Sequence, residues 1–275
     1  MSRHERTPLG LIGGTGFEQA FGRAAPPEAV ATPYGTVAVR RLSLGGRAAV
    51  FWSRHGEDHA LPPHRIPTRA GLWALRSLGV RRVLATAAVG SLAPDRLPPG
   101  TLALVGDAMD FTRGGRAQTY FDGPPLPVVH LEATRLYCPD LGDRLRRAAA
   151  DLGMGELVEV VLVVTEGPRL ETPAEIRAFA RLGAEVVGMT GLPEAALARE
   201  LGMGYASLAV VTNAAAGLAG PISGRDIDRR ARKARARVAA LWRRVAAGLG
   251  ATPCLCCPPP PQAPPFPWPA PGGRG

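Results

Sequence analysis

Short runs of apolar residues alternate with amphipathic stretches through most of the chain. Strands are predicted where four to eight apolar residues are consecutive, at 9–12, 83–88, 102–105, 159–165, 185–188 and 206–211. Helices are predicted where apolar residues recur every three or four positions, at 66–78, 141–152, 173–182, 193–201 and 223–249. Two further strands, 36–41 and 48–52, are predicted to form a hairpin that turns at Gly45 and Gly46. This alternation predicts one α/β domain with a mixed central β-sheet flanked by helices.

The composition changes near both ends of the chain. Residues 1–8 are interpreted as an N-terminal extension and 9–249 as the folded domain. Residues 250–275 contain Cys-Cys-Pro-Pro-Pro-Pro-Gln-Ala-Pro-Pro and are predicted to be a disordered, Pro-rich tail with exposed thiols. Because no apolar run is long enough to span a bilayer and no signal-peptide core follows Met1, we expect a cytoplasmic protein without a membrane partner.

The formal net charge of +10 raises the question of a nucleic-acid partner. Lys233 is the only lysine, and the arginines are spread along the chain. The one dense basic stretch, 225–237, falls on the predicted last helix and is interpreted as a solvated face, with a polyanion-binding patch as the alternative. We therefore predict no nucleic-acid partner.

Two motifs that suit an anion follow predicted strands. Gly13-Gly14-Thr15-Gly16 can present backbone N–H groups and the Thr15 hydroxyl, although a glycine-rich turn alone is as typical of a purely structural turn. Gln19 breaks the dinucleotide-binding pattern. Arg54 and His55 offer a guanidinium fork and a second donor for phosphate. No acid or cysteine stands at a recognised spacing from the histidines, so no metal is predicted.

Five sequence blocks stand in a characteristic order. They are Ile-Gly-Gly-Thr-Gly-Phe (12–17), Ser-Arg-His-Gly-Glu-Asp-His (53–59), Gly-Ser-Leu (90–92), Thr-Glu-Gly-Pro-Arg-Leu-Glu-Thr (165–172) and Gly-Met-Thr-Gly-Leu-Pro-Glu (188–194). Over residues 9–245 the chain resembles the trimeric purine nucleoside phosphorylases. The resemblance extends to the methylthioadenosine phosphorylase branch and, within it, to the S-methyl-5′-thioinosine phosphorylases. It implies a nucleoside phosphorylase-like fold, a homotrimer, and phosphate as co-substrate without any cofactor.

The resemblance also implies roles for individual residues. The phosphate-binding residues would be Thr15, Arg54, His55 and Thr190, and the substrate-binding residues Met189, Glu171, Asn213, Ala214, Ala215 and His130. Asn213 and His55 would be catalytic. The resemblance suggests that His130 reaches a neighbouring subunit, although a plain surface histidine is equally expected. Aligned on Gly90-Ser91-Leu92, a phosphate-binding position of the family falls on Ala87, while Thr86 would point to the opposite face.

Two of these positions bear on the purine. A carboxylate at Glu171 can accept the N1–H of a 6-oxopurine, and the amide of Asn213 can meet O6 and N7. In the adenine-accepting branch these positions are a small hydroxyl residue and an aspartate. A structural alternative for Glu171 is an acid that precedes a helix and is favoured by the helix dipole. Together the two positions favour hypoxanthine or guanine over adenine.

The region that would hold the 5′ end of the sugar contains no histidine, because none follows His130. Enzymes for ordinary inosine and guanosine use such a histidine, whereas Ile222 and Ile227 suit a methylthio group. The predicted activity is that of a pentosyltransferase, the phosphorolysis of S-methyl-5′-thioinosine to hypoxanthine and 5-methylthio-α-D-ribose 1-phosphate. The alternatives are a general 6-oxopurine nucleoside phosphorylase, a methylthioadenosine phosphorylase, and a non-enzymatic polyanion-binding protein.

Overall fold

A computed structural model describes residues 7–14, 20, 26–56, 60–112, 114–250 and 256–268. The strands are β1 (Leu9–Gly13), β2 (Glu28–Thr32), β3 (Gly35–Leu44), β4 (Arg47–Ser53), β5 (Arg82–Ser91), β6 (Leu102–Phe111), β7 (Glu159–Thr165), β8 (Val186–Gly188) and β9 (Gly204–Ala214). The α-helices are α1 (Thr68–Ser77), α2 (Pro139–Asp151), α3 (Pro173–Arg181), α4 (Gly191–Glu200) and α5 (Gly224–Gly248), and a 3₁₀ turn, η3 (Pro63–Arg65), precedes α1. The predicted α/β class is confirmed.

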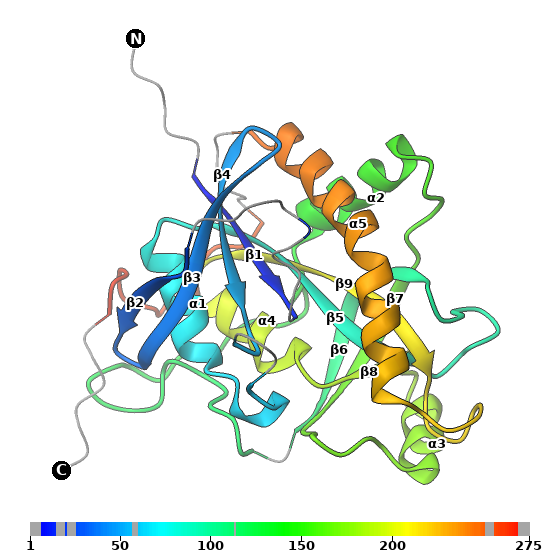
Figure 1. Cartoon of the computed structure of the whole chain (residues 1–275). Helices are drawn as coiled ribbons and strands as arrows, with labels where there is room; N and C mark the ends of the chain where they lie inside the picture. Colours follow the sequence, from blue (N-terminus) through cyan, green and yellow to red (C-terminus); the bar gives the residue numbers. More distant parts are fainter. Residues whose placement is uncertain are drawn as a thin grey trace.

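The strands form one mixed sheet in the order β2-β3-β4-β1-β5-β8-β7-β6-β9 (Figure 1). β5 also pairs with β9 along its whole length, so the half of the sheet from β5 to β9 closes on itself. β1 pairs in parallel with both β4 and β5, which makes the first strand a central one. The carboxyl ends of β1, β4 and β5 therefore meet at one edge, where α/β folds place ligand sites.

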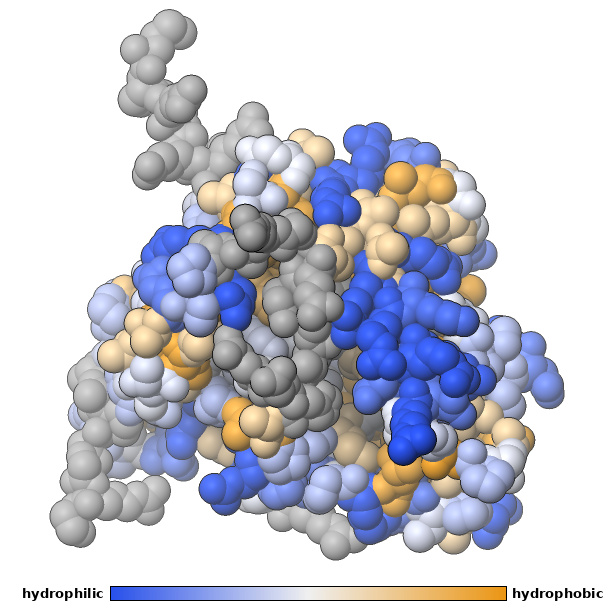
Figure 2. Space-filling view, viewed as in Figure 1, coloured by the Kyte–Doolittle hydropathy of each residue, from blue (hydrophilic) through white to orange (hydrophobic). Residues whose placement is uncertain are grey.

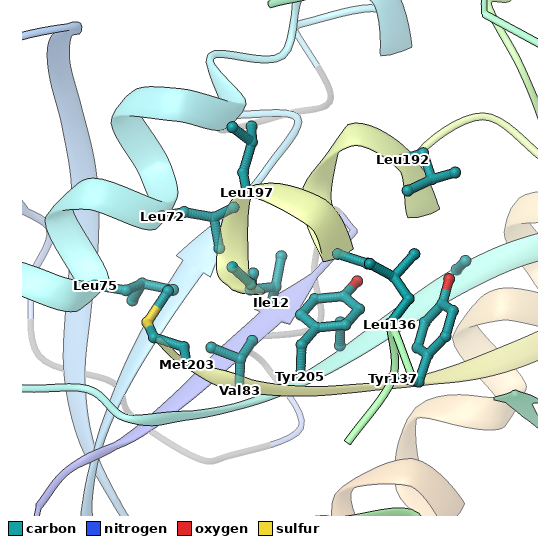
Figure 3. Packing of buried hydrophobic residues seen from close by; sticks show 14 of the residues in the cluster. Ile12, Leu72, Leu75, Val83, Leu136, Tyr137, Leu192, Leu197, Met203 and Tyr205 are labelled. Carbon is teal, nitrogen blue, oxygen red and sulfur yellow. The ribbon is translucent and has the colours of Figure 1, made fainter. Parts of the chain in front are cut away.

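Alternation along the strands separates two layers of core. On β1, Ile12 packs into the cluster that holds α1 and α4, whereas Leu9 and Leu11 pack into the cluster that holds α2 and α5. Figure 3 shows the first cluster, with Leu72 of α1 and Leu197 of α4 close to Ile12. The helices thus cover the sheet in the pairs α1 with α4 and α2 with α5.

Local sequence signals account for the turns and ends that position these elements. The β3–β4 hairpin turns at Gly45 and Gly46, whose φ angles of +56° and +76° suit glycine. Helix α3 begins at Pro173, and Thr172 caps it in a reciprocal capping box with Glu175. Both features agree with the elements predicted from the sequence.

The C-terminal segment differs from its prediction. Residues 256–268 pack against the domain, because Trp268 and Cys257 are only 5% and 2% exposed and belong to the two core clusters. Trp268 contacts the aromatic rings of Trp73 and Phe121, and Cys257 shares its cluster with Cys138. The packing of residues 256–268 departs from the predicted disorder, and the expectation of an exposed thiol is wrong for Cys257. The aromatic residues of this segment supply the apolar surface for packing. The high proline content led to the prediction of disorder.

Other differences are smaller. β2 was not predicted, because its alternating burial is partial and only Val30 and Thr32 are shielded to any extent. β6 continues six residues beyond its predicted end, through a bulge between Val105 and Asp107. In the part of the chain that the structure describes, no helix is both long and apolar enough to cross a membrane.

Candidate functional site

A cavity of about 650 Å³ lies between the sheet and the first half of α5. Its walls come from the loops after β1, β4, β7 and β8, from the C-terminal parts of β5 and β9, and from residues 222–235. Figure 1 shows α5 lying along β9 on this side of the sheet. The cavity is therefore built by segments that are as much as 221 residues apart in the sequence, from Gly14 to Arg235, but adjacent at one sheet edge.

The residues expected to bind phosphate converge on this cavity. Gly14 follows β1, Arg54 and His55 follow β4, and Thr190 follows β8, and all four line it. Thr15 lies outside the described residues, so its predicted role stays a prediction. Thr190 is the N-cap residue of α4, yet its side chain makes no capping hydrogen bond. Its hydroxyl is thus not engaged by the helix that it precedes.

Arg54 is held in a buried network. Its Nε and Nη2 donate to the two carboxylate oxygens of Glu194 at 2.9 and 2.8 Å, and its Nη1 donates to the carbonyl of Thr86. The side chains of Arg54 and Glu194 are 3% and 1% exposed. A guanidinium has five N–H donors, so one on each Nη is left for an anion in the cavity. The bidentate pair fixes the plane of the guanidinium and hence the direction of those two donors.

Tyr205 completes the network from β9, donating its hydroxyl to Glu194. Burial, with Glu194 alongside, raises the pKa of the Tyr205 phenol well above its ordinary value, so the phenol remains a donor. Sequence reasoning missed both residues. Glu194 ends the block 188–194 as an acid within an apolar stretch, which marks it as unusual but does not reveal its partner 140 residues away.

The orientation of His55 is set by its own loop. Its Nδ1 lies 2.9 Å from the carbonyl oxygen of Leu61, and the N–H of Leu61 donates to the carbonyl of His55. A carbonyl can only accept, so Nδ1 carries the proton. Nε2 is then an acceptor in the neutral imidazole and a donor in the imidazolium. His55 is 7% exposed.

Glu171 and Asn213 line the same cavity, as the sequence predicts. Oε1 of Glu171 accepts from the hydroxyl of Thr165 at 2.7 Å, which leaves Oε2 for a ligand. Nδ2 of Asn213 donates to the carbonyl of Ala214 at 2.8 Å, and Oδ1 lies 2.8 Å from the hydroxyl of Thr212. One amide N–H of Asn213 remains to donate to a ligand.

Met189 also lines the cavity, at the base of the loop between β8 and α4. It packs against Gly167, whose φ is +67° and where an added Cβ would lie 2.6 Å from the sulfur of Met189. The positive φ suits glycine, and a larger residue would displace the Met189 side chain. The side chain predicted to contact the sugar therefore packs against the loop after β7.

Three of the predicted substrate-binding residues are not brought to the cavity within one chain. Ala214 and Ala215 are absent from its lining, and Ala215 is 2% exposed in a small core cluster. Ala214 contributes instead the carbonyl that holds Asn213. His130 is exposed in the segment between β6 and α2, away from this cavity.

The expectation for Ala87 is corrected. Ala87 is 2% exposed and packs in the cluster that includes α1 and α4, whereas Thr86 and Ala88 line the cavity. Alternate residues of β5 face opposite sides of the sheet, but Val89, which shares the face of Ala87, also lines the cavity. The Ala87 side chain itself is not part of the lining.

Helix α5 contributes more than was predicted. Ile222 and Ile227 line the cavity, in agreement with their selection as apolar candidates. Asp228, Arg232 and Arg235 line it too, and sequence reasoning assigned this basic stretch to a solvated face. Figure 2 shows a broad hydrophilic band on this face of the molecule, over the position of α5 in Figure 1. One edge of that band thus borders the cavity.

Known proteins resemble this chain over most of its length. The Phosphorylase superfamily profile matches residues 8–247. A probable S-methyl-5′-thioinosine phosphorylase of Methanopyrus kandleri is 50% identical over 212 residues, which cover 77% of this chain and 80% of the relative. A probable 6-oxopurine nucleoside phosphorylase of Thermococcus kodakarensis is 49% identical, covering 76% of this chain and 80% of the relative.

A solved structure shares the architecture. The methylthioadenosine phosphorylase of Schistosoma mansoni, in complex with adenine, superposes with a TM-score of 0.83 at 29% identity. The alignment covers 90% of this chain and 93% of that one. With the family profile spanning nearly the whole described domain, the chain belongs to the Phosphorylase superfamily.

Proposed function

We propose that this chain is a pentosyltransferase that catalyses the reversible phosphorolysis of S-methyl-5′-thioinosine to hypoxanthine and 5-methylthio-α-D-ribose 1-phosphate. The observation that carries the proposal is that Glu171 and Asn213 line the same cavity as Arg54, His55 and Thr190. One cavity thus combines a carboxylate and an amide suited to a 6-oxopurine with a set of anion donors. The relative in Methanopyrus kandleri bears the same activity in its name.

In this mechanism the glycosidic bond lengthens first, which builds positive charge on C1′ of the sugar and negative charge on the purine. The free N–H of Asn213 donates to the purine edge, and the unbonded oxygen of Glu171 accepts from N1–H. Phosphate, bound by the two remaining donors of Arg54 and by His55 and Thr190, attacks C1′ from the opposite face. Holding the anion in place supplies much of the rate. Inorganic phosphate is a co-substrate, and no cofactor enters.

A general 6-oxopurine nucleoside phosphorylase is the second candidate, and one observation favours it. Asp228 lines the cavity beside Ile227, so the α5 wall contains an acceptor that a 5′-hydroxyl could use in place of a histidine. The relative in Thermococcus kodakarensis is named for that activity. A methylthioadenosine phosphorylase is the third candidate, disfavoured by the donor that Asn213 presents.

The deciding experiment compares kcat/KM for methylthioinosine, methylthioadenosine, inosine and adenosine with phosphate present. A preference of about a hundredfold or more for methylthioinosine supports the proposal, because the apolar residues would penalise an unpaired 5′-hydroxyl. Equal rates with inosine would establish the general enzyme, and Asp228→Ala should then lower inosine turnover selectively. A preference for methylthioadenosine would overturn the assignment of the base.

The quaternary structure and location belong to the same proposal. We propose a cytoplasmic homotrimer in which His130 approaches the cavity of a neighbouring subunit, since it is exposed and does not line the cavity of its own subunit. Sedimentation or mass photometry would test the trimer. Mixing His130→Ala subunits with subunits inactivated at Arg54 would test whether His130 acts across the interface. A polyanion-binding role would instead require salt-dependent binding to nucleic acid without phosphorolysis.

A further inference from the structure

Arg116 lies on an irregular segment between β6 and α2, where arginine side chains are usually exposed. Its side chain is only 7% exposed. It does not line the cavity described above, and no role for it follows from the proposed reaction. The role of Arg116 must therefore be inferred from its hydrogen-bond partners.

All five donors of the Arg116 guanidinium are used. Nη1 donates to the carbonyls of Met189 at 2.6 Å and Leu192 at 3.2 Å. Nη2 donates to the carbonyls of Thr165 at 3.3 Å and Glu166 at 2.6 Å, and Nε donates to the carboxylate of Glu166 at 3.3 Å. Apart from the carboxylate, the acceptors thus divide equally between the end of β7 with its following loop and the connection from β8 into the start of α4.

These two loops leave neighbouring strands at the edge that forms the cavity. β7 and β8 pair in parallel as far as Val164 and Gly188. Beyond these two residues the two backbones no longer pair with each other. Arg116 supplies donors to the carbonyls immediately after this point on both sides. Without it, those inward-facing carbonyls would lose hydrogen bonds in a poorly solvated place.

Each loop carries one half of the candidate site. The β7 loop carries Glu171, whose carboxylate is held by the Thr165 hydroxyl, and the Thr165 carbonyl is held by Arg116. The β8 loop carries Met189 and Thr190, and the Met189 carbonyl is held by Arg116. The side chain therefore joins the residue that faces the base to the residues that face the sugar and the anion.

We infer that Arg116 is a positioning residue that fixes the base-facing loop 165–171 relative to the loop 189–192. The expected effect of Arg116 on catalysis rests on the proposed phosphorolysis. The proposal that Arg116 holds the two loops together does not depend on it. A lysine keeps the charge but has three donors at one point, so it cannot span four carbonyls on two loops. Hydrogen bonds to four carbonyls on two loops require the planar guanidinium group of arginine, with its five N–H donors.

The test compares Arg116→Lys and Arg116→Ala with a matched control, Glu166→Gln. The control removes the ion pair but leaves all four carbonyl hydrogen bonds in place. We expect both Arg116 variants to lower kcat for the substrate that the wild type prefers by about 10- to 100-fold, as misplacement of reacting groups does. The KM for phosphate should change less than kcat does, because Arg54 and His55 lie on another loop and Thr190 is the only described phosphate-binding candidate on the loop that Arg116 holds. Glu166→Gln should retain near wild-type kinetics.

Two readouts separate positioning from a general loss of fold. Hydrogen–deuterium exchange should rise in Arg116→Lys over both 165–171 and 188–192, while α2 stays protected. Added guanidinium or methylguanidinium at low millimolar concentration should restore part of the activity of Arg116→Ala, since it can occupy the vacated fork.

The outcomes are distinct. Wild-type kcat in Arg116→Lys, exchange confined to 114–118, or activity that falls only in step with the folded fraction would overturn the inference. If the wild type phosphorolyses no nucleoside, the proposed function fails. The exchange experiment then still decides whether Arg116 holds the two loops together.

Discussion

At the scale of single residues, the side chains that line the site could be predicted from their chemistry. The residues that hold those side chains in place could not be predicted. Arg54, His55, Glu171 and Asn213 were selected by what their polar atoms can bind, and all four line one cavity. Glu194 was missed because its role depends on a partner 140 residues away. The sequence also did not reveal that Thr86 lines the cavity and Ala87 does not, because that depends on how β5 packs in the fold.

Asn213→Asp tests the purine preference. The amide N–H that donates to O6 would be replaced by an acceptor, so the carboxylate and O6 would repel each other. We expect kcat/KM for methylthioinosine to fall by about 10- to 100-fold and turnover of methylthioadenosine to rise. Assays of the two nucleosides side by side measure the switch. An unchanged ratio would mean that Asn213 does not face position 6.

Glu194→Gln tests the network behind Arg54. Removal of one charge would leave the guanidinium buried without its counterion, which costs about 3–5 kcal/mol in comparable buried pairs. We expect the free energy of unfolding in urea to fall by roughly that amount, and the KM for phosphate to rise about tenfold as the two free donors lose their direction.

The exposed pair between Arg244 and Asp151 provides the control, with side chains 52% and 46% exposed. Asp151→Asn should change the unfolding free energy by less than about 1 kcal/mol and leave phosphate binding unaltered. Equal effects from the two variants would show that the Arg54–Glu194 pair has no special role.

At the scale of elements, helices and strands with strong patterns were predicted within a few residues, and the differences concern polar or irregular parts. The helix predicted at 173–182 is α3 (Pro173–Arg181), because Pro173, Thr172 and Glu175 form a local start signal. The second half of β6 was missed because Asp107 and Asp110 interrupt its apolar pattern. Local signals predict where an element begins, whereas tertiary pairing decides how far a polar strand continues.

The capping box of α3 gives a prediction at this scale, since Glu171 lies just before it. The Thr172 side chain accepts from the Glu175 N–H at 3.2 Å, so Thr172→Ala should lower the unfolding free energy by about 1 kcal/mol at every pH. Thermal unfolding monitored by circular dichroism would measure the loss. No loss would mean that the first turn of α3 frays in the wild type.

Glu175→Gln should behave differently with pH. The hydrogen bond from Arg169, followed by that from the Thr172 N–H, lowers the pKa of Glu175 to about 2 from 4.5. A pKa lowered by folding contributes stability that is present above 4.5 and lost as pH falls toward 2. Because the pair is largely exposed, we expect a difference of less than about 1 kcal/mol at pH 7 that shrinks below pH 4.5. A difference independent of pH would contradict the ionic contribution.

At the scale of the whole molecule, the fold class followed from the alternation of strands and helices, but the closure of the sheet did not. The pairing of β5 with β1, β8 and β9 places two strands on one side of β5 at different heights, and no local pattern encodes such an arrangement. This closure is what brings the ends of β7, β8 and β9 to the cavity. The C-terminal segment was mispredicted for a related reason, because composition alone does not reveal a docking site.

The docking of that segment can be tested with Trp268→Ala. Trp268 is 5% exposed, and its ring lies 4.6 Å from Phe121 and 5.5 Å from Trp73, centroid to centroid. Loss of a buried tryptophan costs about 3–5 kcal/mol, or less if the segment detaches without unfolding the domain. Urea unfolding should therefore show a clear loss of stability, whereas Gln262→Ala, at an exposed position of the same segment, should not. Because no residue of 256–268 lines the cavity, kcat/KM should stay unchanged. If the Trp268 variant were as stable as the wild type, residues 256–268 would not pack stably on the domain. The segment would then be disordered, as its composition predicts.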